Sequence, residues 1–324
     1  MVTISGMLRE KHNRLFRDLI FIFLSLLIVS VAVFSLSSFS SGSISYYVLG
    51  ESADESSVKE LSSSLGLERP FIIRYLEFLK SFFTFNWGKN IQGYEIRSLI
   101  AKRFSVTVEV LLLTLILSLP LSILASCSAM KKQRGLWDRG SDLLVLFIMS
   151  LPSFSIAILL MLIFSVSIPF FPTSGFVPLS LSLPGNLRTV FLPSLSLALM
   201  HGALYVRVLK KSLRRELCSE YVLGARARGK GWQDIIYREA FPPASLSLLS
   251  LASQSVSSLI AGSAVTETVF ALPGLGSLIV SASLARDTQT VSILIMLIAL
   301  TVSITSIAAR ILISCMSGRG GVDG

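Results

Sequence analysis

Long apolar runs separated by short polar segments make up most of the sequence. A helix needs about 20 mostly apolar residues to cross the hydrocarbon core of a bilayer. Six runs predict such helices, at about 19–38, 106–130, 143–168, 189–206, 244–266 and 290–313. The first run is longer than the roughly 7–15 apolar residues of a signal peptide. This length favours a retained membrane anchor over a cleaved signal peptide. The pattern predicts an all-α membrane protein with six transmembrane helices.

Prolines mark the places where these runs should bend or stop. The stretch PFFPTSGFVPLSLSLPGN, residues 169–186, carries four prolines, two glycines and no charge. It predicts a short non-helical connection between the third and fourth spans. Pro120 and Pro152 lie inside the second and third spans. They predict bent helices there, because proline removes a backbone donor that neighbouring helices must replace.

One polar region, residues 39–103, contains a second kind of pattern. Aromatic and charged side chains alternate at helical spacing within PFIIRYLEFLKSFF. One face carries Phe71, Tyr75, Phe78 and Phe82, and the other carries Arg74, Glu77 and Lys80. We expect an amphipathic helix that lies on the membrane surface or on a partner subunit.

Composition and charge support membrane residence and give an orientation. The chain has 324 residues, of which 52% are hydrophobic and 15% charged, whereas soluble domains have about 25% charged residues. The net charge of +10 comes largely from basic residues in three short segments, at 9–17, 131–139 and 207–238. Since basic loops stay in the cytoplasm, both termini are expected there. This clustering explains the charge better than nucleic-acid binding does.

The expected organisation follows from this topology. Residues 1–18 form a cytoplasmic tail, 19–38 the first span and 39–103 an extracytoplasmic segment with the amphipathic helix. A five-helix transmembrane core covers 104–314 and contains a cytoplasmic loop at 207–243. A short cytoplasmic tail, 315–324, ends the chain.

The loop at 207–243 has the pattern of a structured element. Leucines at helical spacing extend the fourth span past Val206, and small residues then permit a reversal: Ala225, Ala227, Gly229 and Gly231. Helical periodicity resumes at Trp232, and Pro242-Pro243 are expected to end that helix before the fifth span. This layout predicts a helix–turn–helix that docks on another protein. The alternative is a solvated basic loop that only sets topology.

Ionisable groups inside the spans are few and dispersed. Glu109 is expected to reach the interface or pair with Arg103. Glu267, ahead of Pro273 and Gly274, either accepts backbone N–H bonds in a turn or serves a gate. His201 is a packing residue or a substrate contact, and one histidine makes no metal site.

Other chemistry is not expected. The three cysteines have no metal or disulfide spacing. An enzyme would need a paired nucleophile and base, and the sequence suggests no such pair. The sequence also has no G-x-x-x-x-G-K-[ST] stretch to hold ATP. No repeated halves suggest a self-sufficient secondary carrier or channel. No cofactor is expected.

The segment EYVLGARARGKGWQDIIYREA, residues 220–240, resembles the cytoplasmic EAA loop of binding-protein-dependent ABC transporter permeases. It is most similar to the dipeptide, oligopeptide and nickel subfamily. Segments such as RFSVTVEVLLLTLILSLPLSILA, MSLPSFSIAILLMLIFSV, FFPTSGF and AGSAVTETVFALPGLGSLIVSASLARD resemble the same subfamily, in order, from about residue 65 onward. Leu223-Gly224, Glu239 and Pro242-Pro243 depart from its usual residues.

The resemblance implies a non-catalytic permease subunit with the fold of type I ABC importers, in a bacterial inner membrane. Its coupling segment would contact a separate ATPase through Glu220, Tyr221, Ala225, Arg226, Ala227 and Gly229. Glu267, Pro273, Gly274 and His201 would be gate or translocation residues. Implied partners are a homologous second permease, two ATPases, an extracytoplasmic binding protein and lipid. The implied cargo is a di- or oligopeptide, with nickel as the alternative.

Overall fold

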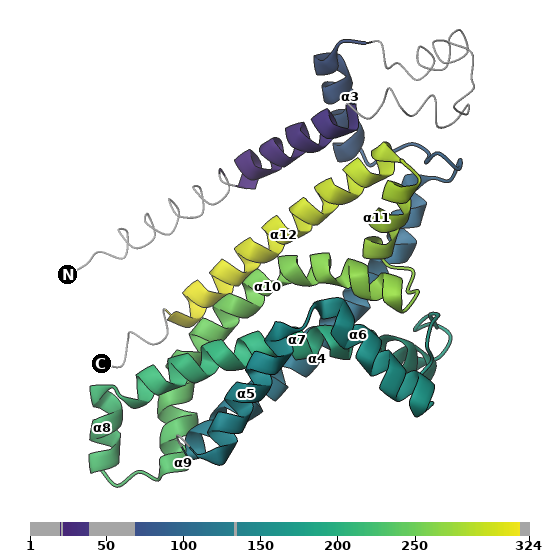
Figure 1. Ribbon diagram of the computed structural model, residues 1–324. Coiled ribbons are helices and arrows are strands. Elements are labelled where there is room, and N and C mark those ends of the chain that lie inside the picture. Colours follow the sequence, from purple (N-terminus) through teal and green to yellow (C-terminus); the bar gives the residue numbers. More distant parts are fainter. Residues whose placement is uncertain (1–19, 21, 39–68, 133–134, 318–324) are drawn as a thin grey trace, which may run out of the picture. The chain divides into compact units, whose positions relative to one another are not determined.

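A computed structural model describes residues 20, 22–38, 69–132 and 135–317, and these residues form helices joined by short connections (Figure 1). Within these described residues, Lys89 and Glu95 form an isolated antiparallel β-bridge. The chain divides into two compact units, 1–102 with 278–307 and 103–277 with 308–324. The predicted N-terminal tail, 1–18, lies outside the described residues.

Four helices are long and apolar enough to cross a membrane. They are the helix at Ile96–Lys131, that at Leu183–Leu217, the continuous helix at Trp232–Val269 and the stretch Thr288–Ala308. A bent pair, Leu136–Ser150 with Ser153–Ser167, raises the number to five if it counts as one span. The first predicted span corresponds to a 17-residue apolar helix at Ile22–Ser38. The chain is therefore all-α, with four or five candidate spans among its described residues.

The first unit contains the amphipathic helix, α3 at Phe71–Phe83. Its aromatic face packs on Phe34 of the Ile22–Ser38 helix, with ring centroids of Phe71, Tyr75 and Phe78 within 5.2–5.6 Å of that of Phe34. A hydroxyl contact of 2.7 Å joins Ser30 and Tyr75. Phe34 of the chain's own first helix thus contacts part of this aromatic face, while Phe71 remains 43% exposed. The expected contact of this helix with the membrane surface or a partner subunit stays a prediction.

Helix α4, at Ile96–Lys131, begins earlier than the second predicted span. Its first two turns lie in the segment predicted as extracytoplasmic, 39–103, and the location of that segment stays a prediction. Because these turns contain polar residues such as Arg97 and Lys102, the apolar run alone did not predict this part of the helix. Pro120 lies within α4, which continues through it.

The third predicted span is two helices, not one. Helix α5, at Leu136–Ser150, and helix α6, at Ser153–Met161, meet at an angle of 101°, and a π-helical stretch η1 follows at Leu162–Ser167. Proline excludes its preceding residue from helical geometry, and Leu151 is accordingly extended at φ −90° and ψ 138°. Pro152 thus breaks this element more sharply than the expected bend.

Helix α7, at Leu183–Leu217, is longer than the fourth predicted span at both ends. It begins within the proline-rich connection, because Pro184 occupies the first turn, where a backbone donor is not needed. The Ser182 hydroxyl accepts a hydrogen bond of 3.2 Å from the N–H of Gly185 and caps this end. The expected extension past Val206 is confirmed.

The helix after the loop does not stop at Pro242-Pro243 as expected. Short helix α9 at Trp232–Asp234 leads through a π-helical stretch, η2 at Ile235–Ala240, into α10 at Phe241–Val269. The two prolines occupy the first turn of α10, and the π-helical stretch changes the hydrogen-bond partners just before them. A helix can therefore continue through two adjacent prolines when a π-helical stretch precedes them, which the sequence pattern did not predict.

The core of the second unit forms around α7, which contacts α5, α6 and α10. One buried cluster joins the end of α4 to the lower part of α7 and to η2, with Met130, Leu209 and Ile236 fully buried. A second cluster joins α4, α6, α7 and the end of α10. Two further helices follow among the described residues, α11 at Leu275–Leu284 and α12 at Thr288–Ser317.

Candidate functional site

Helix α8, at Glu220–Ala227, forms the reversal between α7 and α9 (Figure 1). Gly229 follows it with φ +80°, a left-handed conformation that glycine adopts without a Cβ penalty. Its N–H donates to the carbonyl of Arg226 at 3.0 Å, and the N–H of Lys230 donates to that of Ala225 at 3.3 Å. The predicted glycine reversal is therefore confirmed at Gly229.

The two faces of α8 differ in burial. The side chains of Val222 and Ala225 are buried in the protein interior, so the small side chain at 225 serves internal packing. Glu220, Tyr221, Leu223, Arg226 and Ala227 are exposed. Tyr221 and Leu223 are 43% and 55% exposed, which places two large apolar side chains on the outer surface of a basic region. Five of the six residues predicted for docking thus face outward, and Ala225 does not.

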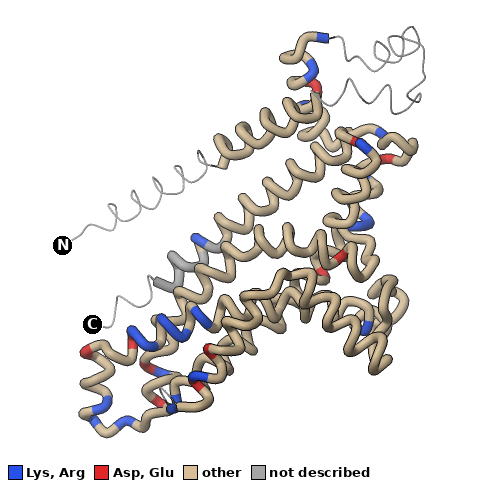
Figure 2. Tube along the Cα trace, in the orientation of Figure 1, with Lys and Arg blue, Asp and Glu red and all other residues tan. Residues whose placement is uncertain are grey.

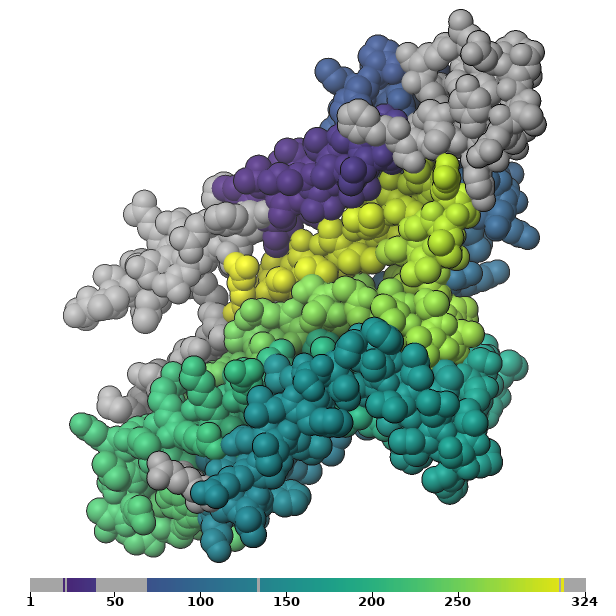
Figure 3. Space-filling model, viewed as in Figure 1, coloured from purple at the N-terminus to yellow at the C-terminus, as the bar shows by residue number. Residues whose placement is uncertain are grey.

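Charged residues gather around this reversal (Figure 2). The end of α7 and the α8–α9 segment carry about half of the lysines and arginines of the second unit, whereas the middle parts of α4 and α10 are nearly uncharged. In the space-filling view the α7–α8 region, in green, lies at the surface beside the teal α5 (Figure 3). The charge distribution is that of a segment outside the bilayer.

Trp232 holds the reversal in place. Its indole N–H donates to the carbonyl of Met130, the penultimate residue of α4, at 3.1 Å. The guanidinium of Arg226 lies 5.6 Å from the centroid of the Trp232 ring, within cation–π range. Lys230 and Glu239 form an ion pair across the base of the loop. These contacts make α8 a fixed part of the fold.

Tyr221 is oriented by a carboxylate. Its hydroxyl donates to Oε2 of Glu216 at 2.9 Å, and Arg215 donates to Oε1 of the same residue. Partial burial is the main cause that raises the pKa of the Tyr221 phenol, and the bond to Glu216 acts in the same direction. The hydroxyl therefore remains a neutral donor at physiological pH.

A second group of predicted residues lies in the turn between α10 and α11. Glu267 is fully buried, and its Oε1 accepts from the Thr107 hydroxyl at 2.8 Å. Its Oε2 accepts from the N–H of Ser277 at 2.9 Å, while the Thr107 hydroxyl accepts from the N–H of Leu275 at 2.8 Å. The expected role of Glu267 as an acceptor of backbone N–H in a turn is confirmed.

Glycine is required beside this carboxylate. A Cβ on Gly274 would lie 2.2 Å from the carboxyl carbon of Glu267, and one on Gly276 would lie 2.3 Å from the Cα of Ala264. Pro273 is exposed in the same turn. Glu267, Gly274 and Pro273 are thus brought together, and Thr107 joins them as a residue that sequence reasoning missed. The second apolar run contains several other hydroxyl residues, so the sequence offered no signal that singled out Thr107.

His201 lies on α7, apart from the elements that form this turn. It is partly buried, its ring centroid is 6.3 Å from that of Tyr205, and its Nδ1 has no hydrogen-bond partner among the described residues. Across the described ranges, no group of three histidine, cysteine or carboxylate side chains is placed to hold a metal ion.

Glu109 has a partner that was not expected. The amide of Asn186 donates to its Oε2 at 2.9 Å and also to the carbonyl of Val177, also at 2.9 Å. Asn186 belongs to the first turn of α7, which sequence reasoning had left outside the helix. Glu109 was expected to reach the interface or to pair with Arg103, and the contact found here is this amide bond between α4 and α7.

Comparisons with known proteins match this chain to membrane components of transport systems. Residues 118–317 match the family described as "Binding-protein-dependent transport system inner membrane component". A putative peptide transport system permease protein of Brucella abortus is 33% identical over 267 residues, covering 82% of this chain and 85% of that protein. The oligopeptide transport system permease protein OppB of Salmonella typhimurium is 30% identical over 234 residues, covering 72% and 74%. OppB of Escherichia coli K12 is 31% identical over the same length.

Proposed function

This chain belongs to the family of binding-protein-dependent transport system inner membrane components, and we propose that it forms half of the translocation pathway of an ATP-driven peptide importer. Relatives that it matches along most of their length are named as peptide and oligopeptide permeases. The cargo proposed is accordingly a di- or oligopeptide, delivered by a soluble binding protein on the outer side of a bacterial inner membrane.

The proposed membrane arrangement has six spans with both termini in the cytoplasm. The helix at Ile22–Ser38 and the bent pair α5–α6 each count as one span in this arrangement, together with the four long helices. The basic residues around α8 support a cytoplasmic location for that segment. The chain then has its 207–243 segment and the start of α5 on the same side of the membrane.

The proposed role of α8 is to dock in a groove of a separate ATP-hydrolysing subunit. The single observation that carries this is an anchored helix whose outer face presents Tyr221 and Leu223 to solvent. Exposed apolar side chains in a polar region are typical of interaction sites. The rigid attachment through Trp232 would pass a displacement of α8 into α4 and α10.

The remaining proposed partners are a homologous second permease and a second ATPase. Two permeases would enclose the pathway between them, in contact with lipid on their outer faces. The turn that holds Glu267, Pro273 and Gly274 would be part of the outer gate, and its buried bonds support a role in shaping the gate rather than in binding cargo. His201 would line the pathway on α7.

A copurification and uptake experiment tests the function. The full chain, expressed with its neighbouring genes, is purified through a tag and reconstituted, and uptake of radiolabelled trialanine is measured with and without ATP. We expect an ATPase and a second permease to copurify and uptake to require ATP. Loss of nickel uptake but not of peptide uptake on deletion would contradict the peptide proposal, and uptake by the purified chain alone would contradict the importer proposal.

A further inference from the structure

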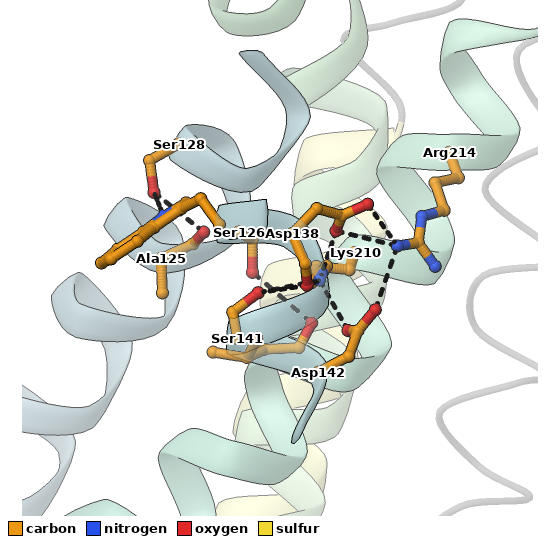
Figure 4. Close-up of polar contacts among 10 residues, drawn as sticks. Ala125, Ser126, Ser128, Asp138, Ser141, Asp142, Lys210 and Arg214 are labelled. Carbon is orange, nitrogen blue, oxygen red and sulfur yellow. Dashed lines mark hydrogen bonds and ion pairs between the residues drawn. The ribbon is translucent and has the colours of Figure 1, made fainter. Parts of the chain in front are cut away.

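A buried cluster of charges joins α5 to α7 where α7 leads into α8 (Figure 4). The Lys210 side chain is 2% exposed and that of Asp138 is 4% exposed. Lys210 Nζ lies 2.6 Å from Oδ1 of Asp138 and 2.5 Å from Oδ1 of Asp142. It also donates to the Ser141 hydroxyl at 3.0 Å. Every one of these partners belongs to the first two turns of α5.

Arg214, one turn further along α7, completes the cluster. Its Nη2 lies 2.9 Å from Oδ1 of Asp138 and 3.3 Å from Oδ2 of Asp142. Two cations on α7 therefore face two anions on α5, and the four charges sum to zero. Asp142 and Arg214 are each 47% exposed, so the cluster runs from the protein interior to the surface.

General stability is a weak reason for such a cluster. Moving charges out of water has a cost that their attraction often only balances, and apolar residues of similar volume usually serve as well. What the cluster adds is a fixed register: four charged groups and one hydroxyl bond well in one alignment of α5 along α7. A slide of either helix would leave a buried charge without its partner.

The cluster lies between α8 and the break that separates α5 from α6, so a fixed alignment of α5 and α7 would connect these two elements. Towards the C-terminus, α7 runs two turns from Lys210 to its end at Leu217, and α8 starts three residues later at Glu220. Towards the other side, α5 leads from Asp142 to the 101° break before α6. The hydrophobic cluster of Val145, Ala203 and Val206 continues the same α5–α7 interface beyond the charges.

We propose that Lys210, with Asp138 and Asp142, is a positioning group for transport that locks α5 to the stem of α8. A displacement of α8 by the ATPase is then carried through α7 into the bent pair α5–α6. The inference rests on the proposed docking of α8. It assigns the transmission of that movement to one ion-pair cluster, and it gives Lys210 a role other than setting membrane topology.

The variants are chosen to separate transmission from folding. Lys210→Met with Asp138→Asn removes both buried charges together, so that no unpaired charge remains and Arg214 still faces Asp142. Lys210→Arg keeps the positive charge. Lys211→Met changes an exposed neighbour on α7 in the same way and is the matched control. Asp142→Asn, at the half-exposed end of the cluster, is a milder second probe if the double variant fails to fold.

Two readouts are measured on the tagged assembly in lipid nanodiscs and in proteoliposomes. Spin labels at Arg215→Cys on α7 and Phe147→Cys on α5, both exposed positions, report the distance between the helices. Exposed Cys218, as well as Cys315, is replaced by serine in this background. Trialanine uptake per ATP hydrolysed reports coupling.

We expect one narrow distance distribution in the wild type, in Lys210→Arg and in Lys211→Met, and a broad one in the neutral double variant. In that variant, uptake per ATP should fall roughly 3- to 30-fold while the copurifying subunits remain bound. Unchanged distances and unchanged uptake per ATP in the double variant, or in Asp142→Asn, would overturn the inference. If the wild type takes up no trialanine, the proposed function fails, and the distance distributions still decide whether the cluster locks α5 to α7.

Discussion

At the scale of single residues, glycines serve two different purposes in the two turns described above. Gly229 has a left-handed backbone, and a Cβ there would meet no atom within 4 Å. Gly274 has no such φ, but a Cβ there would overlap the carboxylate of Glu267. Conformation alone therefore selects glycine after α8, whereas close packing selects it after α10.

Substitution at Gly229 should test the first of these purposes. Gly229→Ala is expected to lower the free energy of unfolding by about 1–2 kcal/mol, because alanine is strained in the left-handed region. Gly140→Ala is the matched control, since a Cβ there also meets open space but the residue lies in helix α5. The control should stabilise by about 0.5–1 kcal/mol. Thermal unfolding in detergent measures both, and equal effects would contradict the argument.

The buried carboxylate of Glu267 makes a second prediction at this scale. Glu267→Ala leaves the donors of Thr107 and Ser277 without acceptors, and each orphaned donor costs about 1–3 kcal/mol. Combining it with Thr107→Val should cost less than the sum of the two single changes.

Thr268→Val is the control for this cycle, because its hydroxyl is exposed and bonds only within α10, to the carbonyl of Ala264. Its effect should stay within about 0.5 kcal/mol. Strict additivity of Glu267→Ala and Thr107→Val would show that the two side chains do not act together.

At the scale of elements, sequence patterns located the helices well and their ends less well. Apolar runs predicted the cores of the long helices, because lipid-facing length is a strong constraint. Proline was the main source of error. It starts α7 at Pro184, breaks α5 from α6 at Pro152 and is accommodated after a π-helical stretch at Pro242, and these outcomes depend on neighbouring hydrogen bonds that spacing does not reveal.

Charged contacts between elements were the least predictable feature. The basic segment that contains Lys210 predicts only the membrane orientation, and the sequence around Asp138 predicts no partner for this lysine. One signal was available: Lys210 lies four residues after Val206 and three before Leu213, on the apolar face of α7. A lysine on such a face needs an anionic partner, but only the fold identifies α5 as its source.

The packing of α3 on the first helix supplies the prediction at this scale. Phe34→Ala removes three aromatic contacts, each of which is worth about 0.5–1.5 kcal/mol. The amides of α3 should then exchange with deuterium faster, as measured by mass spectrometry in detergent. Phe23→Ala, at a 68% exposed position of the same helix, should leave α3 unchanged. Equal exchange in the two variants would mean that Phe34 does not hold α3.

At the scale of the whole molecule, the chain is a transmembrane protein in which one large group of charges lies around α8 (Figure 2). The family could be recognised from sequence, because ordered motifs carry that information along most of the chain. How α8 is attached, through Trp232 on one side and the Lys210 cluster on the other, needed the fold. Both attachments lead from one small surface into long helices, which suits a subunit moved by a neighbour.

The most direct test of that picture uses a native cysteine. Cys218 is exposed and lies immediately before α8, whereas Cys127 is buried, and Cys315→Ser removes the remaining thiol. A membrane-impermeant maleimide should leave Cys218 unlabelled in intact cells and label it in inside-out vesicles, with added ATPase subunits protecting it. Labelling of Cys218 in intact cells would place α8 on the outer side and contradict its docking on an ATPase.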